Sequence, residues 1–192
     1  MSELLKELAK AGFPVASVDE LRRSGSRYTA AFPVLIKALQ REQDYKEKEW
    51  IVRALSVPWA RPAAISPLIH EFINASEDDL EKVALLRWAI GNALDVLWDD
   101  DDFEALADLA RQQRYGRSRE MLVLGFGKSK RKNEAVELLE GLVADDDVSG
   151  HAIAALAKLA HPSARPVLDA ATSHPKAWVR KAAKRGLHKL SK

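Results

Sequence analysis

The sequence predicts an all-α protein, and three observations support this prediction. Alanine and leucine together occupy 55 of the 192 positions, and both residues favour helices. Threonine occurs only at Thr29 and Thr172, while the valines and isoleucines follow helical spacing instead of alternating with polar residues. No Asn-Gly or Asp-Gly dipeptide, the strongest short hairpin signal, separates two alternating runs. An all-α fold is therefore expected before any motif is considered.

The first 26 residues predict a short pair of helices. A leucine-rich amphipathic segment comes first and ends near Gly12. Ser17 and Glu20 then have the spacing of a capping box, in which the serine oxygen accepts a backbone N–H and the glutamate reaches back. A second short helix is expected from there to about Arg23. Residues 1–26 are therefore expected to form an N-terminal helical cap.

The rest of the chain predicts ten helices that recur in pairs. Segments that begin near a proline form one kind of helix, and segments of small residues that end in a large apolar residue form the other. The closing apolar residues are spaced by 39, 32, 30 and 31 residues, and they are Leu55, Leu94, Phe126, Leu156 and Leu187. The expected helices span about 29–41, 45–57, 63–74, 78–97, 101–113, 117–127, 133–144, 148–160, 163–172 and 176–190.

A period near 30 residues with two helices in each period is typical of an α-solenoid. One helix pair has an apolar stripe on each side and cannot bury both stripes alone, whereas the next pair along the chain covers the exposed one. Small residues such as Ala89, Ala93, Ala182 and Gly186 allow neighbouring helices to approach closely. A single domain is therefore expected over residues 1–192, with the repeats in residues 29–190.

Two features resemble the HEAT-repeat family, in its short bacterial form. One is Val179-Arg180 followed by Ala182-Ala183 and Leu187, and the other is the proline near the start of the partner helix, at Pro33, Pro67 and Pro166. The resemblance covers about residues 29–190, with a shorter period than the ~40–47 residues of most HEAT and armadillo units. It implies a right-handed α-α superhelix of about five two-helix repeats behind the N-terminal pair.

The resemblance also implies roles for particular residues. In HEAT-like repeats an arginine near the start of the second helix ties neighbouring units together, and Arg87, Arg119 and Arg180 occupy that position here. The partner-binding surface of the family is commonly the concave face lined by the second helices. The same face is therefore expected to bind a partner in this protein.

Charge is distributed unevenly along the chain. Residues 1–64 carry 11 basic and 8 acidic side chains, residues 65–113 carry 3 and 12, and residues 114–192 carry 16 and 8. The net charge of +2 therefore combines local values of +3, −9 and +8. Because segments of a solenoid follow one another in space, an acidic middle and a basic C-terminal end are expected to be separate surface regions that steer a partner.

Eleven residues in these regions are candidate binding residues. For the acidic ones, the alternatives are a site for a basic partner or cation and simple stabilisation of a helix N-terminus. For the basic ones, the alternatives are phosphate contact, with the tryptophan available to stack, and a polar face that keeps a terminal repeat soluble. The candidates are Asp99, Asp100, Asp101, Asp102, Lys128, Lys130, Arg131, Lys132, Trp178, Arg180 and Lys184.

Catalytic and cofactor motifs are mostly absent from the sequence. It contains no Gly-x-Ser-x-Gly, Walker, His-Glu-x-x-His or Rossmann pattern, so no catalytic residue, metal or cofactor is expected. One enzyme class with HEAT-like architecture, the alkylpurine DNA glycosylases, uses a tryptophan and an acid in a basic groove. Trp98 with Asp102 and Trp88 with Asp95 are superficial candidates for that pair, although the acidic stretch around Trp98 would repel phosphate.

The sequence thus predicts a noncatalytic scaffold or adaptor that binds a protein partner through its curved face. The alternative is a nucleic-acid-binding or DNA-repair module of the glycosylase type that uses the basic C-terminal zone. The absence of cysteine fits a reducing cytoplasm, and no apolar run is long enough to predict a membrane span. The sequence leaves the oligomeric state open.

Overall fold

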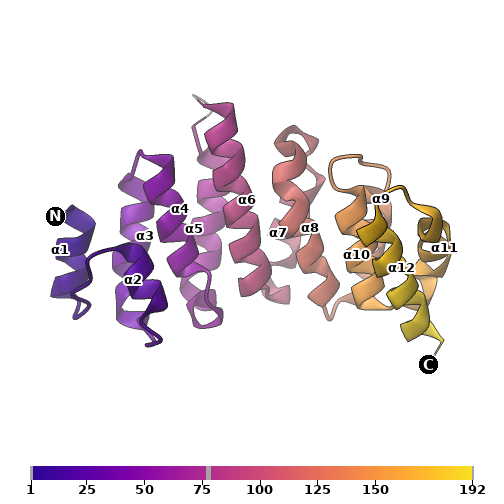
Figure 1. The fold of residues 1–192 in the computed structure, drawn as a ribbon, viewed down its shortest axis with the longest axis horizontal. Helices are drawn as coiled ribbons and strands as arrows, with labels where there is room; N and C mark the ends of the chain where they lie inside the picture. The colour runs from indigo at the N-terminus through magenta and orange to yellow at the C-terminus, as the bar shows by residue number, and fades with distance from the viewer. Residues whose placement is uncertain (1, 77–78, 192) are drawn as a thin grey trace. The chain divides into compact units, whose positions relative to one another are not determined.

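The computed structural model describes residues 2–76 and 79–191, and over these ranges the protein is helical and has no strand (Figure 1). The all-α prediction is therefore confirmed. Short 3-10 turns lead into or extend several of the helices. The α-helices are α1 (Glu3–Lys10), α2 (Val18–Arg23), α3 (Phe32–Arg41), α4 (Tyr45–Leu55), α5 (Arg61–Asn74), α6 (Leu80–Leu97), α7 (Phe103–Arg111), α8 (Glu120–Gly125), α9 (Lys132–Leu142), α10 (Ser149–Leu159), α11 (Arg165–Ala170) and α12 (Ala177–Leu190).

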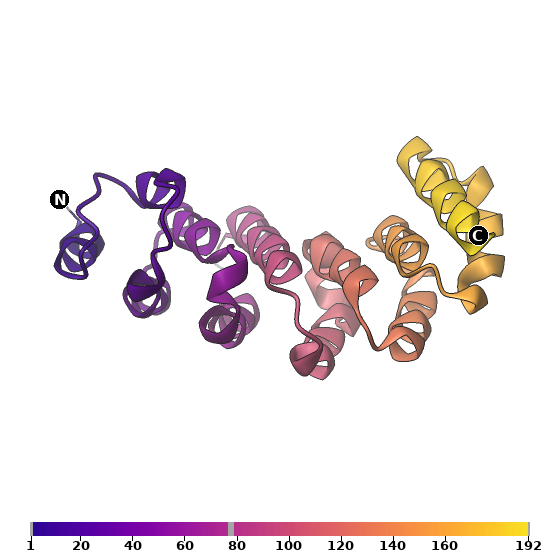
Figure 2. The same ribbon diagram turned by 90° about the horizontal axis from the view of Figure 1, so that it is seen from below.

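The chain divides into two compact units, residues 1–97 and residues 98–192. In the first unit the helices form two layers. Helix α3 contacts α1 and α5 in one layer, while α4 contacts α2 and α6 in the other, and α3 and α5 pair across the layers with α4 and α6 (Figure 2). This alternation of layers is the local arrangement that the two-helix repeat predicts.

The second unit alternates in the same way. Helix α10 contacts both α8 and α12 in one layer (Figure 2). Helices α7, α9 and α11 pair with α8, α10 and α12 respectively. We use "second helices" below for α2, α4 and α6 of the first unit and for α8, α10 and α12 of the second. The right-handed superhelix and the single domain stay predictions.

Several helices begin where local sequence signals predict. The Ser17 hydroxyl accepts the Glu20 amide N–H at 3.1 Å, as the predicted capping box requires. The Glu20 carboxylate reaches back as well, but it accepts the amide N–H of Ala16, one residue before the N-cap, at 2.7 Å. Pro33 lies in the first turn of α3, where its missing N–H costs nothing. Pro67 was expected to open a helix and does not, because α5 already begins at Arg61 and Pro67 lies inside it.

Small residues bring the second helices of the C-terminal unit into close contact. A Cβ atom added at Gly186 of α12 would lie 2.8 Å from the Cα atom of Ala157 on α10. Real Cβ atoms do not approach so closely, and only glycine therefore fits the packing of α10 against α12. The predicted role of Gly186 is confirmed.

Candidate functional site

The arginines at the repeated position bind backbone carbonyls, and of these Arg87 and Arg119 are buried and Arg180 is half-buried. Arg87 of α6 donates from Nε to the carbonyl oxygen of Phe72 at 2.8 Å, at the end of α5. Arg180 of α12 donates from one guanidinium nitrogen to the carbonyl oxygens of His174 and Pro175, at 2.8 and 2.7 Å. Each guanidinium group thus satisfies carbonyl oxygens at the C-terminal end of the preceding helix or in the loop that follows that helix.

Arg119 makes the same link and adds one to the next helix pair. Its side chain is fully buried, and its nitrogens donate to the carbonyl oxygens of Ala110 and Gly116, both at 2.9 Å. The remaining nitrogen donates to the Asp145 carboxylate at 2.8 Å, just beyond the end of α9. The tie between neighbouring helix pairs that the resemblance implies is therefore present at Arg119.

Sequence reasoning missed one member of this set. Lys48 of α4 lies seven residues before Leu55, as Arg87, Arg119 and Arg180 lie seven before their own closing residues. Its ammonium group contacts the Glu71 carboxylate of α5 at 2.5 Å, and both side chains are largely buried. The spacing of seven residues before the closing apolar residue was the sequence signal that could have identified Lys48. This position holds helix pairs together, so the candidate binding residue Arg180 has a structural role.

The acidic run Asp99–Asp102 and the basic loop Lys128–Lys132 lie against each other. The Ser129 hydroxyl and the Lys130 amide N–H donate to the Asp100 carboxylate at 2.6 and 2.8 Å. The predicted separation of an acidic and a basic surface region is therefore wrong at this point. Stacking of successive helix pairs brings together residues that lie one repeat period apart in the chain, as Asp100 and Lys130 do.

Arg131 is also engaged within the protein. Its guanidinium contacts Glu104 at 2.6 Å and Glu134 at 3.1 Å, and it lies 4.2 Å from the ring centre of Phe103. The Lys130 and Lys132 side chains are exposed. The charge of Arg131 is thus neutralised by acidic side chains of α7 and α9. The basic loop therefore offers less positive charge to a ligand than its composition suggests.

The acidic run forms and caps the turn that leads into α7. The Asp99 carboxylate accepts the Asp101 amide N–H at 3.3 Å and caps a 3-10 turn of residues 100–102. Burial raises the pKa of Asp100, but hydrogen bonds from Ser129, Lys130 and Trp98 outweigh this effect and hold the pKa below its ordinary value of 3.8. Burial, together with Asp99 and Asp101, raises the pKa of Asp102.

Trp98 and Asp102 do not form an open site for a flipped base. The Trp98 side chain is 7% exposed, packs edge-on to Phe126 at 4.7 Å between ring centres, and donates from Nε1 to Asp100 at 3.3 Å. A buried ring cannot stack on a nucleotide. The superficial glycosylase pair of Trp98 and Asp102 is therefore absent.

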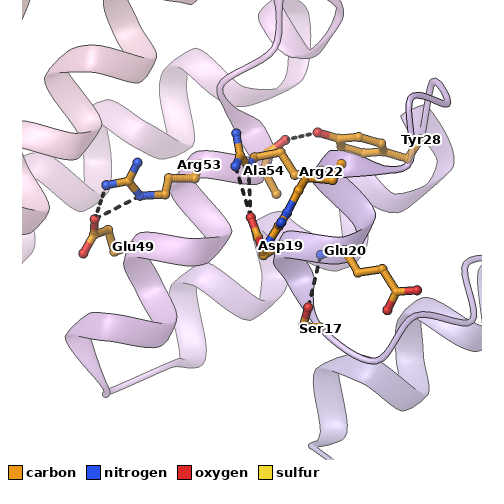
Figure 3. Close-up of polar contacts among 9 residues, drawn as sticks. Ser17, Asp19, Glu20, Arg22, Tyr28, Glu49, Arg53 and Ala54 are labelled. Atoms are coloured by element: carbon orange, nitrogen blue, oxygen red, sulfur yellow. Dashed lines mark hydrogen bonds and ion pairs between the residues drawn. The ribbon is translucent and has the colours of Figure 1, made fainter.

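In the first unit, the surface of the second helices contains a groove of about 370 Å³. Arg22 of α2, Arg53 of α4, and Trp88 and Asn92 of α6 line it. Asp19 pairs with Arg22 at 3.1 Å and Glu49 pairs with Arg53 at 2.5 Å, which holds both guanidinium groups in place (Figure 3). Beneath this surface, the buried Tyr28 hydroxyl donates to the carbonyl oxygen of Ala54 at 2.8 Å (Figure 3).

Exposed apolar side chains lie on the same face of α6. Trp88 is 41% exposed and Leu85, one turn earlier, is 57% exposed. Residues three apart on a helix are surface neighbours. Leu85 and Trp88 therefore present a joint apolar patch beside the paired arginines.

In the second unit, the surface of the second helices has a groove of similar size between α10 and α12, also about 370 Å³. We call it the α10–α12 groove. Cationic and small or apolar residues make up its lining, which contains no carboxylate. The lining residues are Leu124, Ala154, Ala157, Lys158, Ala182, Arg185 and Lys189.

The cationic side chains that line the α10–α12 groove differ from those that the sequence suggests as candidates. Lys184 is exposed but does not line it, because one residue along a helix turns the side chain by about 100°. Arg185 and Lys189 are brought to it instead, together with Lys158, which sequence reasoning missed. The helical spacing of 182, 185 and 189 was the signal for α12, and Lys158 lies about one repeat period before them.

Trp178 lies at the N-terminal part of α12 and is 44% exposed. Its ring lies 5.1 Å from the imidazole of His151 on α10. A Cβ atom at Gly150 would come within 2.8 Å of the Trp178 ring, so the indole also covers the backbone of α10. Burial lowers the pKa of His151 below its ordinary value of 6.5. Lys176 and Arg117 lower this pKa further by smaller amounts, and Glu120 raises it.

Comparisons with protein-family models, with curated proteins and with solved structures find no match to this chain. Over the described residues, no helix has both the length and the apolar composition needed to cross a bilayer. Within the same ranges, no group of three or more histidine or acidic side chains is arranged to hold a metal ion.

Proposed function

We propose that this protein is a noncatalytic scaffold of the HEAT-like kind, which binds a protein partner through the exposed surface of its second helices. The observation that carries the proposal is the patch of Leu85 and Trp88 on α6, 57% and 41% exposed, beside the groove that Arg22 and Arg53 line. Exposed tryptophan next to arginine is characteristic of protein interfaces, where both residues are enriched.

The arrangement of the paired helices supports the same conclusion. Arg22 and Arg53 are held by Asp19 and Glu49, so the groove is pre-formed and a partner need not order these long side chains on binding. Buried polar ties such as Arg119–Asp145 and Lys48–Glu71 hold successive pairs in register. We propose a right-handed solenoid as the overall fold and the cytoplasm as the location.

A site-specific photo-crosslinker tests the proposal. We expect a crosslinking amino acid at Trp88 to capture a discrete protein in an extract of the source cells, and excess wild-type protein to compete for it. The control is the same amino acid at Ser66, an exposed position on α5 in the other layer. Equal capture from both positions, or capture that excess Leu85→Asp protein suppresses as well as wild type does, would contradict the proposal.

The second candidate function is binding of nucleic acid by the basic C-terminal zone. The net charge of +8 over residues 114–192 favours it. A salt titration with a DNA duplex distinguishes it from the first, because phosphate binding weakens log-linearly and steeply as salt increases. A duplex that fails to bind at low salt would exclude the second candidate, whereas release of free base from alkylated DNA would contradict the noncatalytic proposal.

A further inference from the structure

Helix α12 carries an unusual excess of positive charge. Its segment 177–190 contains five lysines and arginines and no acidic residue. Lys176, at the start of the helix, makes no side-chain cap, and Arg180 and Lys181 lie in the turns nearest the positive end of the helix dipole. Lys181, Arg185 and Lys189 are also spaced four residues apart, where like charges repel. Of the five, only Lys189 lies in the last turn, where the helix dipole favours a cation, so helix stability does not account for most of this pattern.

Arg185 stands apart from the other arginines of the chain. The sequence has 15 arginines, and 14 of them bond to a carboxylate, a backbone carbonyl or a hydroxyl, or lie over an aromatic ring, within the described residues. Arg185 has no such partner among the residues that the structure describes, although it is exposed at the edge of the α10–α12 groove. A guanidinium group offers five donors in a fixed fork that suits a carboxylate or a phosphate. An anionic ligand would complete its bonding.

The floor of the groove indicates which anionic ligand fits. Leu124, Ala154, Ala157 and Ala182 form an apolar floor, and Lys158, Arg185 and Lys189 supply the charge around it. A Cβ atom at Gly127 would lie 2.9 Å from Cδ of Lys158, so the stem of this lysine rests on the backbone just after α8. The groove thus offers an apolar contact surface and cations at its edge at the same time.

These features favour a peptide over a nucleic acid. A polypeptide segment that carries both carboxylates and apolar side chains would place the first on the cations and the second on the floor. A nucleic acid would use only the cations, because the alanine and leucine side chains of the floor offer no hydrogen bond to a base or a sugar.

We propose that the α10–α12 groove binds an acidic amphipathic peptide segment of a partner protein, with Arg185 as its central anchor. This inference rests on the proposed scaffold function, since it names the chemical class of one partner segment. The peptide lies along the groove with apolar side chains on Ala154, Ala157 and Ala182 and with carboxylates on Arg185 and Lys189.

Fluorescence anisotropy on the full-length protein tests the proposal. The probes are a short fluorescent peptide with glutamate and leucine at helical spacing, the same peptide with glutamine for glutamate, and a short DNA duplex. We expect the glutamate peptide to bind at least about tenfold more tightly than the glutamine peptide. Tighter binding of the duplex, with the steep salt dependence of phosphate contact, would assign the groove to nucleic acid and overturn the proposal.

A pair of charge reversals on α12 provides the matched control. Arg185→Glu and Lys184→Glu change the net charge equally at adjacent exposed positions, but only Arg185 lines the groove. We expect Arg185→Glu to weaken the peptide by at least about tenfold and Lys184→Glu by less than about threefold. Equal losses would show attraction to net charge alone and would overturn the proposal, as would alanine methyl signals of residues 154, 157 and 182 that do not shift when the peptide is added.

The crosslink from position 88 separates this inference from the scaffold function. Trp88 lies in the first unit, and Arg185 lies in the second. If the Trp88 crosslink forms and the glutamate peptide does not bind, the inference about the groove fails and the scaffold function stands. If neither occurs, both fail.

Discussion

Replacement of Arg119 by methionine should destabilise the protein strongly. Arg119 is fully buried and donates hydrogen bonds to two backbone carbonyls and to Asp145. Methionine fills much of the volume but leaves two carbonyls and a carboxylate that is only 10% exposed without their donor. Removal of one partner from a buried ion pair costs about 3–5 kcal/mol, and we expect about 4 kcal/mol for Arg119→Met.

Urea unfolding followed by circular dichroism measures this loss. With a urea dependence of about 2 kcal/mol per molar, the midpoint should fall by about 2 M. Arg117→Met is the control, because Arg117 lies two residues away, pairs with Glu120 and is 74% exposed. Its removal should cost less than about 1 kcal/mol. If Arg119→Met costs no more than Arg117→Met, the buried tie between helix pairs does not have the role assigned to it.

Four further predictions concern packing, pH and binding. Gly141→Ala should stabilise the protein by about 0.5–1 kcal/mol, since a Cβ atom there meets nothing within 4 Å. Gly186→Ala should cost about 1–3 kcal/mol, because its Cβ atom would clash with Ala157. Thermal unfolding that finds Gly186→Ala more stable than Gly141→Ala would contradict the packing of α10 on α12. The pKa of His151 is lowered in the folded protein, so the unfolded chain binds more protons below pH 6.5 and stability should decrease as the pH falls below that value. His151→Gln should lose less stability over the same range, and equal pH profiles would refute this. The crosslink at Trp88, and the unequal effects of Arg185→Glu and Lys184→Glu on peptide affinity, are the binding predictions.

Much of the fold follows from short-range signals in the sequence. The apolar spacing predicts the helices, and Ser17 with Glu20 predicts the start of α2 through a hydrogen bond that spans only three residues. Pro67 suggests a helix start, because proline is disfavoured in a helix interior, but α5 begins at Arg61 and contains this proline beyond its first turn. Local chemistry thus sets the elements but not every boundary.

The site depends on contacts between helix pairs, which composition cannot reveal. The bond between Asp100 and the Lys130 amide joins segments whose charges suggest separate regions. The repeat period of about 30 residues contains that information, because stacked pairs place equivalent positions side by side. In the same way, the net charge of α12 does not distinguish the neighbouring cations Arg185 and Lys184, of which only Arg185 lines the groove where α12 packs on α10.

The central claim is that the surface of the second helices binds a protein partner. It is tested most directly by the affinity of the full-length protein for the partner captured at position 88, measured for wild type, Leu85→Asp and Ser66→Asp. Both substitutions add one negative charge at an exposed helical position, one on each layer. The account predicts a loss of at least about tenfold for Leu85→Asp and less than about twofold for Ser66→Asp. Equal affinity of Leu85→Asp and wild type would contradict it.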